Sequence, residues 1–185
     1  PLVLLVGADD RMMNWRHPIV KDREIEDYVM LAACGRRRGL ITAITRLVHF
    51  GPVPQELLDK HRAVCQVDAT LIRRTLPGKA ACDVLSEGMA TYKQVGWDEE
   101  WKLHHQGGAI GYQPREYKVF QDTYSVIWPN QAFAWNPSIQ GTKSEDTILA
   151  TADGPEMLTE PGPNWPVVEA KVSGKLVPRA GILVK

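Results

Sequence analysis

The hydrophobic period of this sequence changes twice along the chain, and those changes limit the folds open to it. From Pro54 to about Leu76, apolar residues recur at the spacing of one helix face, and Pro77-Gly78 stops the pattern. A second helical segment covers about 80–95. Strand-like runs flank the helices, at 2–6, 28–33, 39–48, 104–112, 122–128, 131–137 and 145–151. This order predicts an α+β domain with antiparallel hairpins and helices on one face.

Two hairpins are predicted from the turn residues. The runs at 28–33 and 39–48 flank a polar, glycine-bearing tip over 34–39, and a last hairpin follows over 169–177. Three adjacent arginines at 36–38 suit a solvated turn better than an anion site.

Composition excludes several classes of protein. The 185 residues carry 22 Lys and Arg against 22 Asp and Glu, with a sequence pI near 7.4. Binding to a phosphate backbone requires an excess of basic side chains, so zero net charge argues against nucleic-acid binding. Apolar runs fall far short of the roughly 20 residues that cross a bilayer, so we expect no membrane association. The length suits a single domain over residues 1–185.

The three cysteines indicate a reducing environment. Cys34, Cys65 and Cys82 are odd in number and have no CxxC spacing, so neither a disulfide framework nor a thiolate zinc site is indicated. Cys65 and Cys82 fall in apolar helical patterns, where a reduced Cys behaves as a small hydrophobe. We therefore expect the protein to be cytoplasmic.

The segment from Trp101 to Glu116 is the most unusual in the chain. It holds adjacent His104 and His105, and three glycines lie within 107–111. Glycine permits close backbone approach, so such runs often line a ligand cleft, and His exchanges protons near neutral pH. A structural loop whose histidines bond to the backbone fits these residues equally well.

A second polar group opens the strand-like run at 145–151. If the strand already extends through Lys143, side-chain alternation places Lys143 and Glu145 on one face and Asp146 on the other. An exposed charged edge is the simpler interpretation. The interpretation as an exposed edge is weakened because Ile148, Leu149 and Ala150 make the strand apolar on both faces, as in a central strand.

The order of these segments resembles the pita-bread superfamily, which includes methionine aminopeptidase, aminopeptidase P, prolidase and creatinase. The most specific motif is SEDTILATADGPEMLT at 144–159, supported by Ile-Thr-Arg at 44–46. The resemblance implies a pita-bread fold over about 1–159, with a curved antiparallel sheet and helices on one face. The family's usual N-terminal helices are missing from the pattern, and 160–185 would form a C-terminal extension with a hairpin.

The peptidases of this superfamily bind two divalent metals through two Asp, one His and two Glu. On this sequence, those five positions fall in chain order on Ala32, Ala43, Gly108, Asn136 and Glu145. A single carboxylate does not hold two hard cations, which need several anionic oxygen ligands. The resemblance therefore implies loss of the two-metal mechanism, and we expect no metal and no cofactor.

Creatinase is a metal-free enzyme of the same superfamily, and it suggests the leading function. By that resemblance, the chain is a metal-independent hydrolase-like protein acting on a small amide, guanidino or peptide substrate. Histidine and glutamate side chains would move the proton. The candidate catalytic residues are His104, His105, Glu116 and Glu145, and the candidate substrate-binding residues are Arg46, Arg115, Asn136 and Lys143.

The alternative is a catalytically inactive pita-bread module, a pseudoenzyme that binds a peptide or protein partner. Several of the six tryptophans lie near the presumed cleft and suit stacking contacts, although ordinary packing accounts for many of them. The chain also fits one segment of a longer protein. A small molecule or short peptide is the expected ligand, and an exposed apolar sheet face would favour a homodimer.

Loss of the metals raises the question of what compensates the carboxylates that remain. An uncompensated buried charge costs several kcal/mol. The sequence places Lys143 two residues before Glu145, and Arg115 next to Glu116. We predict that Lys143 or Arg115 lies within salt-bridge distance of one of these glutamates, with His104 or His105 lining the same cleft.

Overall fold

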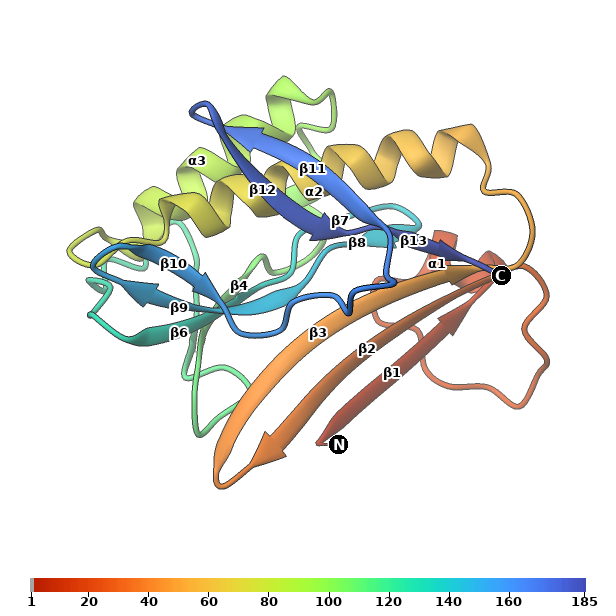
Figure 1. The fold of residues 1–185 in the computed structure, drawn as a ribbon, viewed down its shortest axis with the longest axis horizontal. Coiled ribbons are helices and arrows are strands. Elements are labelled where there is room, and N and C mark those ends of the chain that lie inside the picture. The colour runs from red at the N-terminus through yellow and green to blue at the C-terminus, as the bar shows by residue number, and fades with distance from the viewer. Residues whose placement is uncertain (1) are drawn as a thin grey trace.

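Two large sheets lie beneath two long helices in the computed structural model, which describes residues 2–185 (Figure 1). The helical elements are α1 (Asp10–Asn14), α2 (Gln55–Arg74), α3 (Ala81–Gln94) and the 3-10 helix η1 (Glu100–Leu103). The first strands are β1 (Val3–Ala8), β2 (Tyr28–Arg37), β3 (Leu40–His49), β4 (Gly107–Ile110), β5 (Tyr117–Lys118) and β6 (Gln131–Trp135). The later strands are β7 (Ser138–Ile139), β8 (Thr142–Lys143), β9 (Asp146–Thr151), β10 (Gly154–Met157), β11 (Val167–Val172), β12 (Lys175–Ala180) and β13 (Ile182–Val184).

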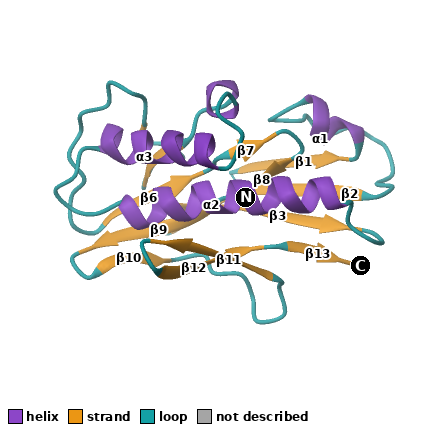
Figure 2. Ribbon diagram, turned by 90° about the horizontal axis from the view of Figure 1, so that it is seen from above, coloured by secondary structure: helices purple, strands orange, loops and turns teal. Residues whose placement is uncertain are grey.

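The described strands group into two large sheets and two ribbons. One sheet has the order β1-β2-β3-β13 and the other the order β10-β9-β6-β4-β5, while β7-β8 and β11-β12 are separate two-stranded ribbons. All of these pairs are antiparallel except β13 with β3, which is parallel. Figure 2 looks onto α2, which crosses above the sheets beside α3. This is the predicted pita-bread arrangement of curved sheets with helices on one side.

The core forms where the helices meet the second sheet. Val64 and Leu71 of α2, Leu85 of α3 and Phe133 of β6 belong to one buried cluster. Burying such side chains contributes roughly 1.5–3 kcal/mol each. Pro54 precedes α2, and Thr75 ends it by donating its hydroxyl to the carbonyl of Leu71 (2.7 Å).

Contacts between β3 and β9 join the two large sheets. The hydroxyl of Thr147 donates a hydrogen bond to the carbonyl of Ala43 (3.0 Å). The same hydroxyl accepts a hydrogen bond from the N–H of Ala43 (2.8 Å). The N–H of Thr45 donates to the carbonyl of Glu145 (3.0 Å). These bonds fix the two large sheets to one another at Ala43–Thr147 and at Thr45–Glu145.

Several predicted boundaries differ from the structure. The first hairpin is longer than expected, because β2 continues through Cys34–Arg37 and only Arg38 and Gly39 form its tip. The prediction of a strand over 122–128 is wrong, since within the described chain that segment makes one isolated bridge, Ala80 with Val126. The short strand β13 was not predicted. Among residues 2–185, none of the helices is long and apolar enough to cross a membrane.

Candidate functional site

A pocket of about 180 Å³ lies between residues of the two large sheets. Its lining comprises Val3, Leu5, His17, Ala32, Ala33, Cys34, His105, Pro114, Arg115, Asn136, Lys143 and Glu145. Strands β1 and β2 supply the apolar wall. The polar residues come from the ends of β6 and β8, from the residue before β9, from the segments that flank β4 and, for His17, from the segment after α1. We call this cavity the Glu145 pocket.

Glu145 is held by two cations and a hydroxyl. The Nζ of Lys143 lies 3.3 Å from Oε2 and the Nη2 of Arg115 lies 3.1 Å from Oε1. The hydroxyl of Thr45 donates to Oε2 at 2.7 Å. The predicted neutralisation is confirmed, and His105 lines the same pocket as expected.

Electrostatics keep Glu145 ionised. Its side chain is only 6% exposed, and burial alone would raise its pKa. The charges of Lys143 and Arg115 outweigh burial and hold the pKa of this carboxyl below its usual range. Glu145 is therefore a carboxylate in the folded protein, and both of its oxygens contact protein groups.

Arg46, a candidate substrate-binding residue, points instead into a buried ion-pair network. Its Nη2 donates to Asp146 and to the carbonyl of Thr159, both at 2.8 Å. Asp146 also pairs with Arg179 (2.8 Å), which in turn contacts Asp68 (2.7 Å). The predicted opposite facing of Glu145 and Asp146 is confirmed. Arg46 pairs with Asp146 and is not part of the Glu145 pocket lining.

Glu116 is not the second buried carboxylate that we predicted in the cleft. Its side chain is exposed, and Oε1 accepts the backbone N–H groups of Tyr112 (2.7 Å) and Gln113 (3.1 Å). These bonds shape the loop after β4. Because this local bonding satisfies the carboxylate, Glu116 needs no cation from the pocket.

Asn136, a candidate substrate-binding residue, is part of the pocket lining. It follows β6 and is 2% exposed. Its N–H donates to the carbonyl of Gln106 (3.0 Å), which fixes the backbone. Its Oδ1 is buried and finds no hydrogen-bond partner within residues 2–185. The acceptor capacity of this oxygen is therefore unused within the described chain.

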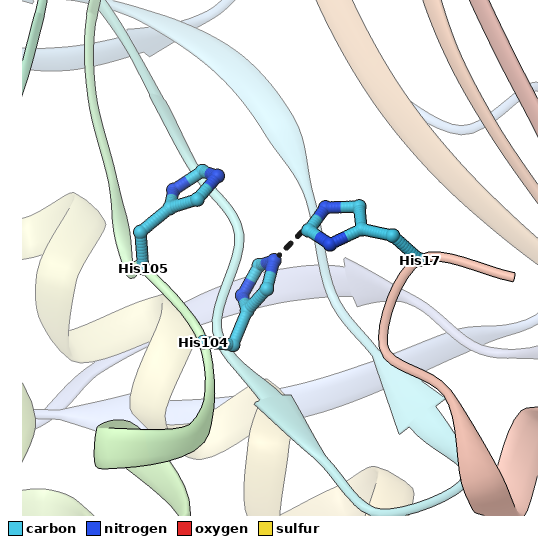
Figure 3. A group of neighbouring side chains, drawn as sticks. All are labelled: His17, His104 and His105. Carbon is cyan, nitrogen blue, oxygen red and sulfur yellow. Dashed lines mark hydrogen bonds between the residues drawn. The ribbon is translucent and has the colours of Figure 1, made fainter.

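His104 and His105 come together with a third imidazole, His17 (Figure 3). The Nε2 atoms of His104 and His17 are 3.2 Å apart, and the rings of His104 and His105 are stacked with centroids 4.6 Å apart. We did not predict His17, because it lies in an irregular segment after α1 that has no apolar period. Only the long-range packing of that segment brings it to the site.

The three imidazoles are kept unprotonated. Burial, followed by the charge of Arg115, lowers the pKa of His105 to about 3. Burial and Lys143 lower the pKa of His104 far below its ordinary value and also lower that of His17. Neutral imidazoles donate and accept hydrogen bonds, but at these pKa values they are weak bases near pH 7.

The residues present do not fit the two-metal centre of the superfamily. Ala32, Ala43, Gly108 and Asn136 supply neither a carboxylate nor an imidazole, and both oxygens of Glu145 are already bonded. At Gly108, where the resemblance places the histidine ligand, an added Cβ would overlap the carbonyl oxygen of Tyr117. Strand β5 thus fills the space that the ligand's side chain would need.

Among residues 2–185, the His17, His104 and His105 cluster is the one other group of side chains suited to binding a metal ion. Its candidate ligand nitrogens lie within 4.8 Å of one another, and imidazoles suit zinc or copper. The cations Lys143 and Arg115, which disfavour protons on these rings, also disfavour a dication. The surrounding charge therefore argues for neutral hydrogen-bonding roles.

Comparisons with known proteins agree with this fold. Residues 2–152 match the model of metallopeptidase family M24. An uncharacterized peptidase of Staphylococcus aureus (strain MRSA252) is 26% identical over 122 residues, which cover 63% of this chain and 34% of that protein. The chain thus spans about a third of the curated relatives that it matches.

Solved structures with a similar fold include two peptidases. The prolidase from Pyrococcus furiosus has a TM-score of 0.77 at 19% sequence identity. The match covers 85% of this chain and 49% of the prolidase. The X-Pro aminopeptidase from Thermotoga maritima has a TM-score of 0.79 at 18% sequence identity. The match covers 98% of this chain and 49% of the aminopeptidase. The N-terminal domain of the FACT complex subunit SPT16 from chickpea has a TM-score of 0.70 at 11% sequence identity. That match covers 85% of this chain and 42% of the SPT16 chain. With its matched residues 2–152 and its curved sheets under two helices, the chain belongs to metallopeptidase family M24.

Proposed function

We propose that this protein binds a small amide- or peptide-like ligand in the Glu145 pocket without divalent metal ions. The observation that carries the proposal is the pairing of Glu145 with both Lys143 and Arg115. These cations take over the charge balance that metals provide in the peptidases the chain resembles. The ligand would lie against the side-chain amide of Asn136 and the imidazole of His105.

Binding without hydrolysis is the function that the geometry supports best. Activation of water needs a base whose pKa lies near the working pH. The pKa of His105 is lowered to about 3, and that of Glu145 lies below its usual range. Both groups are therefore poor bases at pH 7.

Metal-independent hydrolysis is the second candidate, because His17 contacts His104 in the same cluster. Their Nε2 atoms are 3.2 Å apart, a distance at which a proton can pass between two imidazoles. In this arrangement, a proton taken from water at His105 or His17 would be shared within the cluster. Small amides, guanidino compounds and short peptides would be the substrates.

One panel of compounds separates these functions. Xaa-Pro dipeptides, creatine and simple amides are offered to the protein with and without EDTA, and both calorimetric binding and product formation are followed. We expect saturable binding that EDTA leaves unchanged, with no product. EDTA-resistant turnover that His105→Ala abolishes would establish the second candidate instead.

Two outcomes would contradict metal-independent function altogether. One is turnover that EDTA removes and Mn²⁺ restores. The other is a complete lack of binding across the panel by protein whose circular dichroism spectrum shows that it is folded.

A further inference from the structure

The Glu145 pocket carries more positive than negative charge. Lys143 and Arg115 both lie against Glu145, and their side chains are only 5% and 13% exposed. Among the lining residues that the structure describes, Glu145 is the sole carboxylate. One carboxylate therefore faces two cations, and one positive charge is left without a partner.

The other titratable groups of the lining do not correct this imbalance. His17 and His105 are neutral imidazoles, because burial and the nearby cations lower their pKa values. Burial raises the pKa of the Cys34 thiol, so it is neutral as well. The exposed Lys118, near the same histidines, adds further positive potential.

Hydrogen-bond donors are also left over. Lys143 carries three N–H groups, and its ammonium is paired only with Glu145 within the described chain. The Nε of Arg115 is buried and finds no partner among residues 2–185, while its two Nη atoms bond to Glu145 and to the carbonyl of Pro114. Buried donors of this kind are normally satisfied, so a missing acceptor is indicated.

We propose that the Glu145 pocket recognises a small carboxylate, which pairs with Lys143 and Arg115 and completes the charge balance of the site. This inference rests on the proposed function, since it names the chemical class of the ligand for that same pocket. The apolar wall formed by Val3, Leu5 and Ala32 would contact the ligand's hydrocarbon part. The volume of about 180 Å³ suits a free amino acid or the terminal residue of a peptide.

Acetate and acetamide test the charge requirement directly, because they have nearly the same shape and differ in charge. Their dissociation constants are measured in EDTA by ligand-observed NMR, together with those of L-proline and L-prolinamide. We expect each acid to bind about tenfold more tightly than its amide, as charge-assisted hydrogen bonds exceed neutral ones. Gly-Pro and its amide extend the comparison to a peptide terminus.

Variants locate the effect. Lys143→Met should remove most of the preference for the acid, because it leaves Arg115 and Glu145 as a balanced pair. Lys118→Met removes the same charge from an exposed side chain near the pocket and should leave the preference within about twofold. Glu145→Gln should strengthen acetate binding, since it frees a second cation. Circular dichroism spectra confirm that each variant is folded.

Several results would overturn the proposal. Equal affinity for acid and amide would refute a carboxylate site while leaving metal-independent binding intact. Tighter binding of inorganic phosphate than of acetate or proline would point to a general anion site. Absence of binding by both acids would also refute it. Binding of dipeptides only after Mn²⁺ is added would refute the proposed function itself.

Discussion

Single side chains decide the chemistry of the cleft. Lys143 and Arg115 stand against the one carboxylate that remains from the ligand set of the superfamily. Alternation along one continuous strand predicted that Lys143 and Glu145 share a face. The structure instead ends β8 at Lys143 and begins β9 at Asp146, yet both side chains still line the same pocket. Alternation was not enough to predict His17 or Arg179, because their contacts join segments far apart in the sequence.

Arg179 should be among the most sensitive residues in the chain. It is fully buried and pairs with both Asp68 and Asp146. Arg179→Met leaves two buried carboxylates short of a partner, so we expect a loss of about 3–5 kcal/mol in the free energy of unfolding. Arg62→Met is the matched control, because Arg62 pairs with Asp59 on the surface and should cost less than about 1 kcal/mol. Urea denaturation measures both, and equal losses would contradict this assignment.

At the scale of elements, the helices were easier to predict than the strands. Helices α2 and α3 have long apolar faces and clear proline and glycine boundaries. The apolar residues at 122–128 look like a strand in sequence, yet Tyr124 and Trp128 are 74% and 70% exposed. Strand β13 pairs with β3 from the far end of the chain, and no local pattern reports such a partner.

Strand β4 depends on the absence of a side chain at Gly108. A Cβ there would collide with the carbonyl of Tyr117 and lie 2.9 Å from the Cα of Lys118. We expect Gly108→Ala to separate β4 from β5 and to destabilise the protein by about 2–4 kcal/mol. Gly162→Ala, where an added Cβ meets nothing within 4 Å, should change stability by less than about 0.5 kcal/mol. Thermal melts that shift equally would refute the close approach.

Helix α2 is tied to the ribbons through His61, and this tie should make stability depend on pH. His61 bonds to the hydroxyl of Thr142 (2.8 Å) and to the carbonyl of Ala180 (2.9 Å). Burial lowers the pKa of His61 to about 4, so below pH 6.5 the unfolded chain takes up a proton that the folded protein does not. Stability should therefore fall as the pH drops.

The size of this effect follows from the pKa difference. Between pH 7 and pH 5, we expect His61 alone to cost about 2 kcal/mol of unfolding free energy. His61→Gln, measured by urea denaturation at both pH values, should show a correspondingly smaller change. An identical pH dependence in the two proteins would mean that His61 is not kept neutral by burial.

At the scale of the whole molecule, we propose that two copies associate through the exposed apolar face of the first sheet. Strand β1 is an edge strand, and Leu2, Leu4 and Leu31 are exposed by 44%, 52% and 38%. Exposed apolar patches of this kind mark interaction surfaces, and two-fold homodimers are the commonest way to cover them. Sedimentation equilibrium at micromolar concentration should show a dimer, which Leu4→Lys weakens and Leu176→Lys on β12 does not. A monomer in the unsubstituted protein would end this proposal.

The most direct test of the whole account is whether Glu145 binds a metal ion when one is offered. Crystals grown with Mn²⁺ and measured at a wavelength with strong manganese anomalous scattering answer this at the atom concerned. We predict no anomalous peak at Glu145, with Lys143 and Arg115 in salt-bridge contact with its carboxylate as described above. A manganese peak coordinated by Glu145, with Lys143 turned away, would contradict the claim that cations of the chain have replaced the metals.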